Sequence, residues 1–405
     1  MRQLIFLGVL IFAACNGAPS SGQPQATAGA PVQQGRANAP FQPAFVGQTR
    51  GPEQRSNVTI DTREIASGLN HPWSIAVMPD GNLLVTERAG RLRLITPGGQ
   101  VSDPIAGLPE VFARGQGGLL DVALSPNFAT DRLIYWSYSE PRGGDTNSTS
   151  VARGRLNANA TAVENAQRIF QQNPAWASNG HFGSRLAFDR EGRLYITLGD
   201  RQGDDTRGFA QDRSNTIGKV IRINADGSVP SDNPFVGQAG VSPEIWSYGH
   251  RNVQGADVHP DTGALWTLEH GPRGGDELNL DRPGLNYGWP VISYGIEYRG
   301  AQVTGGIAVQ DGMEQPVYYW DPVIAPGDMD FYRGSLFPWR GDILIAGLNT
   351  RSLVRVRLDG DRVVGEERFA LGVGRIRDLA EAADGSIYVV TDEDNGRVIR
   401  LTPRV

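Results

Sequence analysis

A short phrase of sequence occurs six times in this chain, and it constrains the fold more than any other feature. In each copy an apolar run ends at a turn, which in the clearest copies contains proline, aspartate and glycine, and a second apolar run follows. The copies lie at residues 74–86, 121–135, 186–198, 256–266, 329–346 and 378–391. Apolar, β-branched runs that are separated by turn residues predict pairs of antiparallel strands.

The number and spacing of these copies predict the architecture. Further strands are expected at residues 91–95 and 397–401, after the first and last copies. Six sheet-forming repeats predict an all-β fold, the six-bladed β-propeller. A β-sandwich or two β-domains are the alternatives, but neither predicts a repeated phrase. In a propeller the loops at one end of the central channel form the ligand site.

The N-terminal residues predict export and a linker. Residues 1–15 contain one positive charge, about ten apolar residues and then Cys15, the only cysteine, which is the pattern of a lipoprotein-type signal peptide. Cys15 would then carry a lipid; ordinary cleavage that releases a periplasmic protein is the alternative. Residues 16–55 contain few large apolar side chains, which predicts a disordered tether. Residues 56–405 are the predicted propeller domain.

One of the six copies carries a histidine and an aspartate at its open end. If residues 190–191 form the turn, antiparallel register places His181 opposite Asp200. A bulge at Gly192 would shift the register by one residue and keep the two as neighbours. A carboxylate beside an imidazole fixes its tautomer and stabilises its protonated form, as a general base requires. A structural hydrogen bond at a strand end is the simpler alternative.

The charge composition bears on the partners. A net charge of −6 gives no reason to expect nucleic acid. Lys219 is the only lysine, so nearly every cationic side chain is an arginine, which binds carboxylates in a fixed bidentate geometry. Arg375 and Arg377 are expected on one face of a strand because side chains alternate, and this pair favours an anionic ligand. A solvated strand edge explains the pair almost as well.

Several loops beside the repeats concentrate polar groups. The glycines around Gln116 let the backbone approach a ligand closely, or simply form a flexible turn. Residues 248–252 hold three polar or charged donors. Residues 269–277 end in an Asp–Glu pair, and such oxygen-rich loops supply the ligands that calcium takes. A solvated, charge-rich loop is the alternative.

Taken together, these segments resemble the soluble quinoprotein glucose/sorbosone dehydrogenase family, and in particular its bacterial aldose sugar dehydrogenase branch. The resemblance covers roughly residues 60–403 and rests on Gln116-Gly-Gly-Leu-Leu, His181-Phe-Gly, Leu198-Gly-Asp, Tyr248-Gly-His-Arg-Asn, Glu269-His-Gly-Pro, Asn286-Tyr-Gly-Trp-Pro and Gly374-Arg-Ile-Arg-Asp. Members are six-bladed propellers that use pyrroloquinoline quinone (PQQ) and calcium to oxidise the C1 hydroxyl of aldoses to lactones. An aldose substrate, an external electron acceptor, and a monomer or homodimer that meets a membrane only through an N-terminal lipid are therefore expected.

The resemblance also implies which residues bind the cofactors. PQQ carries three carboxylates, and the positions that match its contacts are Gln116, Arg251, Asn252, Tyr298, Arg375 and Arg377. The carbonyl groups of Gly271 and Pro272 would bind the calcium that also holds PQQ. Glu277 and Tyr287 match a second, structural calcium site, to which the tyrosine would contribute its backbone carbonyl.

For catalysis the resemblance implies three residues. His181 would take the proton from the sugar hydroxyl while hydride leaves C1 for the C5 carbonyl carbon of PQQ. Asp200 would orient His181, and Arg251 with calcium would stabilise the charge that develops on the quinone oxygen.

Two departures from the family pattern keep other functions open. Asn349 stands where the family's glucose dehydrogenases carry a lysine, and Asp328 is expected to put a carboxylate close to the anionic cofactor. One alternative is a calcium-dependent lactonase-type hydrolase, which would need acidic metal ligands in the channel and no Arg375 or Arg377. The other is a non-catalytic binding propeller.

Overall fold

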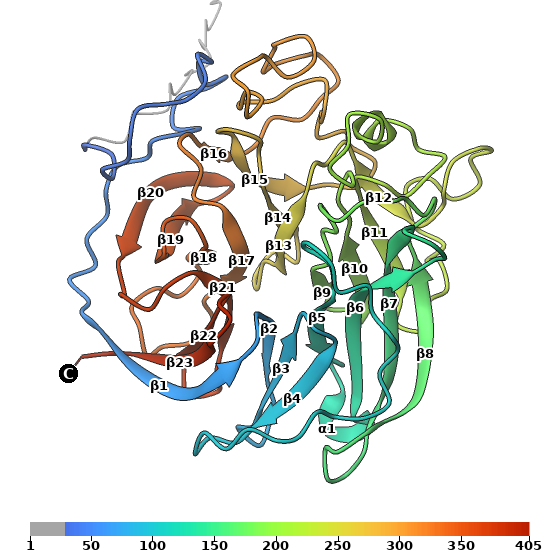
Figure 1. Ribbon diagram of the computed structural model, residues 1–405. Coiled ribbons are helices and arrows are strands. Elements are labelled where there is room, and N and C mark those ends of the chain that lie inside the picture. Colours follow the sequence, from blue (N-terminus) through green and yellow to red (C-terminus); the bar gives the residue numbers. More distant parts are fainter. Residues whose placement is uncertain (1–28, 405) are drawn as a thin grey trace, which may run out of the picture.

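The computed structural model describes residues 29–404, in which six antiparallel sheets surround a common centre (Figure 1). Blades 1 to 3 are, in order, β2 (Pro72–Val77), β3 (Leu83–Glu87) and β4 (Arg91–Ile95); β5 (Leu119–Leu124), β6 (Leu133–Pro141), β7 (Asn147–Leu156) and β8 (Val163–Gln171); and β9 (Leu186–Phe188), β10 (Arg193–Thr197), β11 (Lys219–Asn224) and β12 (Ile245–Tyr248). Blades 4 to 6 are β13 (Val253–Val258), β14 (Leu265–Glu269), β15 (Asp276–Asp281) and β16 (Tyr318–Trp320); β17 (Pro326–Phe331), β18 (Ile343–Gly347), β19 (Ser352–Asp359) and β20 (Arg362–Phe369); and β21 (Ile376–Glu381), β22 (Ile387–Thr391), β23 (Gly396–Pro403) and β1 (Ile60–Leu69). Two four-residue helices, α1 (Phe128–Asp131) and η1 (Arg207–Ala210), lie in connections. In this part of the chain neither helix is long and apolar enough to cross a membrane.

The six repeated phrases are the two innermost strands of the six blades. The first copy is β2–β3, the third is β9–β10 and the last is β21–β22. The innermost strands β2, β5, β9, β13, β17 and β21 contact one another in sequence, and β21 returns to β2 (Figure 1). This arrangement confirms the six-bladed β-propeller and rules out the sandwich and two-domain alternatives.

The first and last parts of the propeller close the ring together. Strand β1 comes from the N-terminal side and pairs with β23, from Ile60 opposite Pro403 to Leu69 opposite Gly396. The sixth blade therefore contains strands from both ends of the domain, while the first blade has three strands. Backbone hydrogen bonds thus hold the ring shut.

Apolar side chains fill the space between adjacent blades. One cluster joins Leu84 and Leu92 of blade 1 to Ile134 and Trp136 of blade 2, and all four are fully buried. Burying an aliphatic or aromatic side chain of this size stabilises the fold by about 1.5–3 kcal/mol each. The resulting rigid ring holds the loops at its end in fixed positions.

Residues 29–55 differ from the predicted disordered tether. Gln48 is fully buried and donates a hydrogen bond to the carbonyl of Pro316 at 2.9 Å. The backbone amides of Asn38 and Ala39 donate to the Asp321 carboxylate at 2.9 and 2.8 Å. The segment, blue in Figure 1, is thus attached to the edge of blade 4 by polar contacts, which its apolar content could not reveal. The predicted signal peptide and Cys15 lie outside the described residues.

Candidate active site

The β9–β10 hairpin positions the predicted base. Leu194 pairs with Phe188 and Tyr195 with Ala187, which is one residue away from the register expected without a bulge. Gly192 has a φ of 78°, a left-handed conformation that suits glycine. The register therefore follows the predicted bulge alternative, in which His181 remains next to Asp200.

His181 and Asp200 form a buried hydrogen-bonded pair. The imidazole Nδ1 lies 2.6 Å from Asp200 Oδ1, and the two residues are 5% and 2% exposed. The side-chain oxygen of Gln116 accepts the backbone N–H of His181 at 2.8 Å, which fixes the backbone. No hydrogen-bond partner for Nε2 is found within residues 29–404. That nitrogen is therefore the one that can accept a proton.

The electrostatics of the pair favour a neutral imidazole beside a carboxylate. Burial lowers the pKa of His181 and the positive charge of Arg251 lowers it further, against the opposing effect of Asp200. Burial by itself would raise the pKa of Asp200, but interactions with His181 and Arg251 outweigh it, so that this pKa is lowered. The pair is therefore in the state that a general base needs before it takes a proton.

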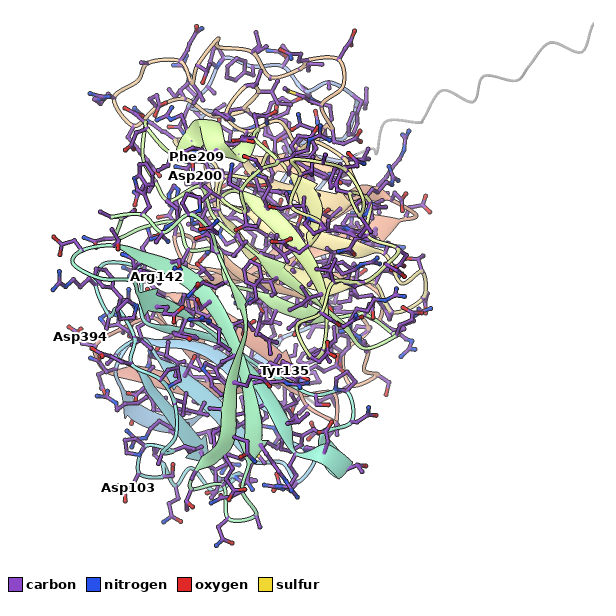
Figure 2. The ribbon with its side chains drawn as sticks, turned by 90° about the vertical axis from the view of Figure 1, so that its right-hand side faces the viewer. Asp103, Tyr135, Arg142, Asp200, Phe209 and Asp394 are labelled. Atoms are coloured by element: carbon purple, nitrogen blue, oxygen red, sulfur yellow. The ribbon has the colours of Figure 1, made fainter. Side chains whose placement is uncertain are left out.

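A cavity of about 230 Å³ opens beside His181. Its wall comes from His181, Asp200, Gln202, Gly203, Arg207, Arg251, Trp289, Glu297, Tyr298 and Arg299. Two loops form the mouth: the one that contains η1 and the long connection between β15 and β16. They are joined where Arg207 donates to the Glu297 carboxylate at 2.6 Å. Figure 2 labels Asp200, and Phe209 of η1, in the upper part of the molecule in that view.

A second cavity, of about 140 Å³, lies beside the first and is lined with arginines. Neighbouring residues of the chain line the two cavities. His181 and Arg251 line the first cavity, and the residues that follow them, Phe182 and Asn252, line the second. The predicted residues Gln116, Asn252, Arg375 and Arg377 all line the second cavity, which also contains Trp73, Arg88, Leu120, Gly183, Gln254, His270, Leu348 and Asp392. The structure thus brings together four of the six predicted PQQ contacts.

Arg377 is the most buried of these arginines. One of its Nη atoms donates to Gln254 at 2.5 Å, and its guanidinium lies 4.3 Å from the ring centre of Trp73. Its buried Nε has no partner in the described part of the chain. Burial lowers the pKa of Arg377 to about 10, so the side chain stays charged at neutral pH. A buried, charged group with an unused donor suits a carboxylate ligand.

Arg375 is held more loosely. Its side chain is 42% exposed and its guanidinium lies 3.7 Å from the Asp392 carboxylate. Asp392 also binds His71 at 2.7 Å. Arg375 and Arg377 therefore line one cavity as expected, Arg375 from the position before β21 and partly exposed, and Arg377 from within the strand and buried.

The four predicted metal positions, which were expected at two separate calcium sites, line one small cavity. Gly271, Pro272, Glu277 and Tyr287 all line a space of about 10 Å³, which is room for one water-sized ion. Arg251 donates to the carbonyl of Gly271 at 2.7 Å, and a second lone pair of that oxygen stays available. Within the described chain no group of three or more His, Cys, Asp or Glu side chains is arranged to hold a metal. A calcium ion here would therefore depend on backbone carbonyls.

Burial also affects the acidic groups at this cavity. It raises the pKa of Glu277 well above its ordinary value, and the nearby Glu269 raises it further. Glu269 accepts the backbone N–H of Arg251 at 2.7 Å and binds His250 at 3.0 Å. These contacts fix the backbone of Arg251 directly beside the base.

Three sequence expectations need correction or refinement. Tyr298 does not line the arginine cavity; it stands at the mouth of the His181 cavity and is 66% exposed. Asp328 does not face an anionic ligand, because its carboxylate binds Arg185 at 2.9 Å in the central channel. Asn349 is exposed and donates to a backbone carbonyl of Val323 at 3.3 Å.

The same channel bears on the hydrolase alternative. Arg185 also binds Asp121 at 3.0 Å and Asp378 at 2.8 Å. Arg185 offsets part of the negative charge of these carboxylates, and within the described residues no group of three or more His, Cys, Asp or Glu side chains is placed to form the acidic metal site that a lactonase-type hydrolase would need.

Several residues of these cavities were not predicted. Trp73, Arg88 and Asp392 line the arginine cavity, and Trp289 lines the cavity of His181. Arg88 and Asp392 each directly follow the second strand of their blade. His270 and Leu348 occupy the same position in blades 4 and 5 and line the same cavity. Alignment of the repeats would have revealed this position, which is shared by blades 1, 4, 5 and 6.

Comparison with known proteins identifies the family of this chain. The family model described as glucose / sorbosone dehydrogenase matches residues 69–400. Aldose sugar dehydrogenase YliI of Escherichia coli K12 is 41% identical over 350 residues, which are 85% of this chain and 94% of that protein.

Solved structures are similar over the same range. The apo form of the soluble aldose sugar dehydrogenase from Escherichia coli has a TM-score of 0.82 at 41% identity, and the match covers 85% of this chain and 100% of that one. The PQQ-bound form of aldose sugar dehydrogenase from Streptomyces coelicolor has a TM-score of 0.70 at 28% identity, covering 86% of this chain and 99% of that one. The chain belongs to the glucose / sorbosone dehydrogenase family and is thus an oxidoreductase.

Proposed function

We propose that this protein oxidises the C1 hydroxyl of aldose sugars to lactones, with PQQ and calcium as cofactors. One observation carries the proposal: His181 is held by Asp200 at 2.6 Å beside a cavity whose wall continues into the arginine-lined cavity. Relatives that are named aldose sugar dehydrogenases, one of them solved with PQQ bound, support it.

The residues of the arginine cavity fit an anionic cofactor. Arg375, Arg377, Gln116 and Asn252 would bind the carboxylates and carbonyls of PQQ, and the unused Nε of Arg377 supplies a buried donor. The carbonyls of Gly271 and Pro272 would bind calcium next to it. Glu277 and Tyr287 line the same small cavity and would complete a metal site there. When bound, PQQ would supply the hydride acceptor and calcium would polarise it.

The chain's own residues then handle the proton and the charge. His181 takes the proton of the C1 hydroxyl at Nε2, because Nδ1 is held by Asp200. The Asp200 carboxylate stabilises the imidazolium that forms. Arg251 lies in the wall of the same cavity and provides a fixed positive charge near the reacting groups. Glu297 and Tyr298 at the mouth would contact the sugar.

The experiment that tests the function uses the protein treated with a chelator and then supplied with calcium, PQQ, an aldose and the dye dichlorophenolindophenol. Dye reduction that needs both calcium and PQQ is the expected result. His181→Ala should still bind PQQ and lose about 10²- to 10⁴-fold in turnover, the usual contribution of a general base. His259→Ala, at the turn between β13 and β14, is the matched control. A folded protein that binds no PQQ would contradict the proposal, and unchanged turnover in His181→Ala would contradict the base.

We also propose export to the cell envelope, with Cys15 as the lipidated residue. The residues that carry this proposal are the apolar stretch and the cysteine of the N-terminal segment. Cys15→Ser should move the protein from the membrane fraction to the soluble fraction. A soluble native protein whose N-terminus lies elsewhere would instead indicate ordinary cleavage.

A further inference from the structure

We propose that Trp289 is a positioning residue for the base: its indole N–H holds the second carboxylate oxygen of Asp200 and thereby fixes the orientation of His181. The inference deepens the proposed function, because it assigns a role in the same site. Trp289 belongs to the Asn-Tyr-Gly-Trp-Pro segment that the sequence singled out, but neither its spacing nor the resemblance gave this side chain a task.

The hydrogen bonds of Asp200 show how the carboxylate is fixed. Oδ1 accepts from His181 Nδ1 at 2.6 Å and from the backbone N–H of Gln202 at 2.8 Å. Oδ2 accepts from Trp289 Nε1 at 2.7 Å. Without the indole, only the two bonds at Oδ1 would hold the carboxylate, which could then turn more easily about its last bond and move Oδ1 relative to the imidazole. The bond is also charge-assisted and therefore among the stronger kinds.

Trp289 is itself anchored by three segments. Its backbone N–H donates to the carbonyl of Gly249 at 2.8 Å, and the amide of Gln211 donates to its carbonyl at 2.7 Å. The indole ring packs against Ala210 and Val303, and the residue is 7% exposed. The donor therefore reaches Asp200 of blade 3 from a loop of blade 4 in a fixed direction.

Two arginines add to this arrangement. The guanidinium of Arg251 lies 5.2 Å from the ring centre of Trp289, and that of Arg207 lies 5.7 Å away. Arg207 also forms the ion pair with Glu297 at the mouth of the cavity. An indole N–H can donate but cannot accept or lose a proton near neutral pH. Trp289 is thus suited to hold the carboxylate without entering the proton transfer.

Three other tryptophans of the described chain make no such bond, whereas Trp320 donates its indole N–H to the Glu366 carboxylate at 3.0 Å. The indole nitrogens of Trp136, Trp246 and Trp339 are buried and have no hydrogen-bond partner in the part of the chain that the structure describes. An indole bond to a carboxylate is therefore made by some tryptophans of this fold and not by others. Trp339, which is fully buried in the loop between β17 and β18, provides a matched control.

The test compares Trp289→Phe with Trp339→Phe, since each keeps an aromatic ring and loses the indole N–H. The first readout is the imidazole ¹⁵N spectrum of the cofactor-free protein, which shows which ring nitrogen carries the proton. The native His181 should be protonated at Nδ1. Trp289→Phe should give a mixture of tautomers, while Trp339→Phe should keep the native signal. With only five histidines in the chain, His181→Gln assigns the signal.

The second readout is sugar oxidation by the protein loaded with calcium and PQQ. Trp289→Phe should lower kcat about tenfold to a hundredfold, the worth of a hydrogen bond to a charged group, and leave KM for the sugar unchanged. A native tautomer in folded Trp289→Phe would overturn the proposal, whatever the value of kcat.

A third measurement covers a variant that fails to fold. This measurement keeps Trp289 and labels the indole nitrogens with ¹⁵N. Compared with the native protein, Asp200→Asn should move the Trp289 N–H signal and leave the signal of Trp339 in place. An unmoved Trp289 signal would overturn the proposal. The two spectroscopic readouts need neither PQQ nor sugar, so they remain decisive if the proposed activity itself is absent.

Discussion

Asp200→Asn is expected to lower kcat about 10³-fold while the protein still folds and binds PQQ. The magnitude follows from the buried pair, in which Nδ1 and Oδ1 are 2.6 Å apart. Once His181 is protonated, its charge and that of the carboxylate lie about 4 Å apart, which is worth about 4 kcal/mol at an effective dielectric constant of about 20. Each 1.36 kcal/mol changes a rate about tenfold, so the loss amounts to about three powers of ten. Asparagine keeps the shape of the side chain, removes the charge and replaces one accepting oxygen with an NH2 group, which cannot accept the N–H of His181 or Trp289.

The assay is steady-state dye reduction at saturating PQQ, calcium and sugar. Asp189→Asn is the matched control, because Asp189 lies at the opposite end of the same hairpin and is also buried. Its Oδ1 accepts the backbone N–H groups of Glu191 and Arg193, which an asparagine oxygen can also accept. A kcat for Asp200→Asn within tenfold of the native value, at unchanged stability, would refute the role of Asp200 as the partner that stabilises protonated His181.

The remaining predictions concern the cofactor, the pH dependence and the N-terminal segment. Arg377→Met should raise the Kd for PQQ about 10- to 100-fold in a fluorescence titration, because a buried charge-assisted bond is lost, whereas Arg400→Met on β23 should not. Since burial and Arg251 hold the pKa of His181 below its ordinary value of 6.5, the neutral base persists to lower pH. The kcat/KM profile should therefore fall only below pH 6.5, and Arg251→Leu should move this fall upward; a native profile that falls above pH 6.5 contradicts the assignment. Gln48→Ala should lower the free energy of unfolding in urea by about 1–3 kcal/mol, because buried polar partners are left unpaired, and an unchanged value would mean that residues 29–55 do not contribute.

The parts of the site that could be predicted depend on short-range pattern. The period of two along a strand places Arg375 and Arg377 at one cavity, and antiparallel register places His181 beside Asp200 even though Gly192 shifts the pairing by one. Both arguments use residues within one blade. They hold because hydrogen bonds and side-chain alternation fix geometry over such distances without knowledge of the remaining chain.

The parts that could not be predicted depend on contacts between segments far apart in sequence. Residues 29–55 were expected to be a tether because apolar content was the criterion, but Gln48 and its neighbours bind blade 4 through polar contacts. Asp328 was expected near the cofactor, but Arg185 lies 143 positions earlier and its place in the channel becomes known only when the ring is closed. A carboxylate that is close to an arginine and one that is not look alike in a sequence.

The contact of Trp289 with the catalytic pair could likewise not be predicted from the sequence. Asp200 follows the second strand of blade 3, whereas Trp289 stands in the long connection between β15 and β16 of blade 4, 89 positions later. Pattern within a blade can bring His181 to Asp200, but only the packing of blade against blade brings a donor to the second carboxylate oxygen. The orientation of the base therefore depends on the closed ring, and not on the hairpin that carries it. An isolated segment with the β9–β10 hairpin and its flanking residues would contain His181 and Asp200, but it would lack the Trp289 contact that holds the carboxylate in place.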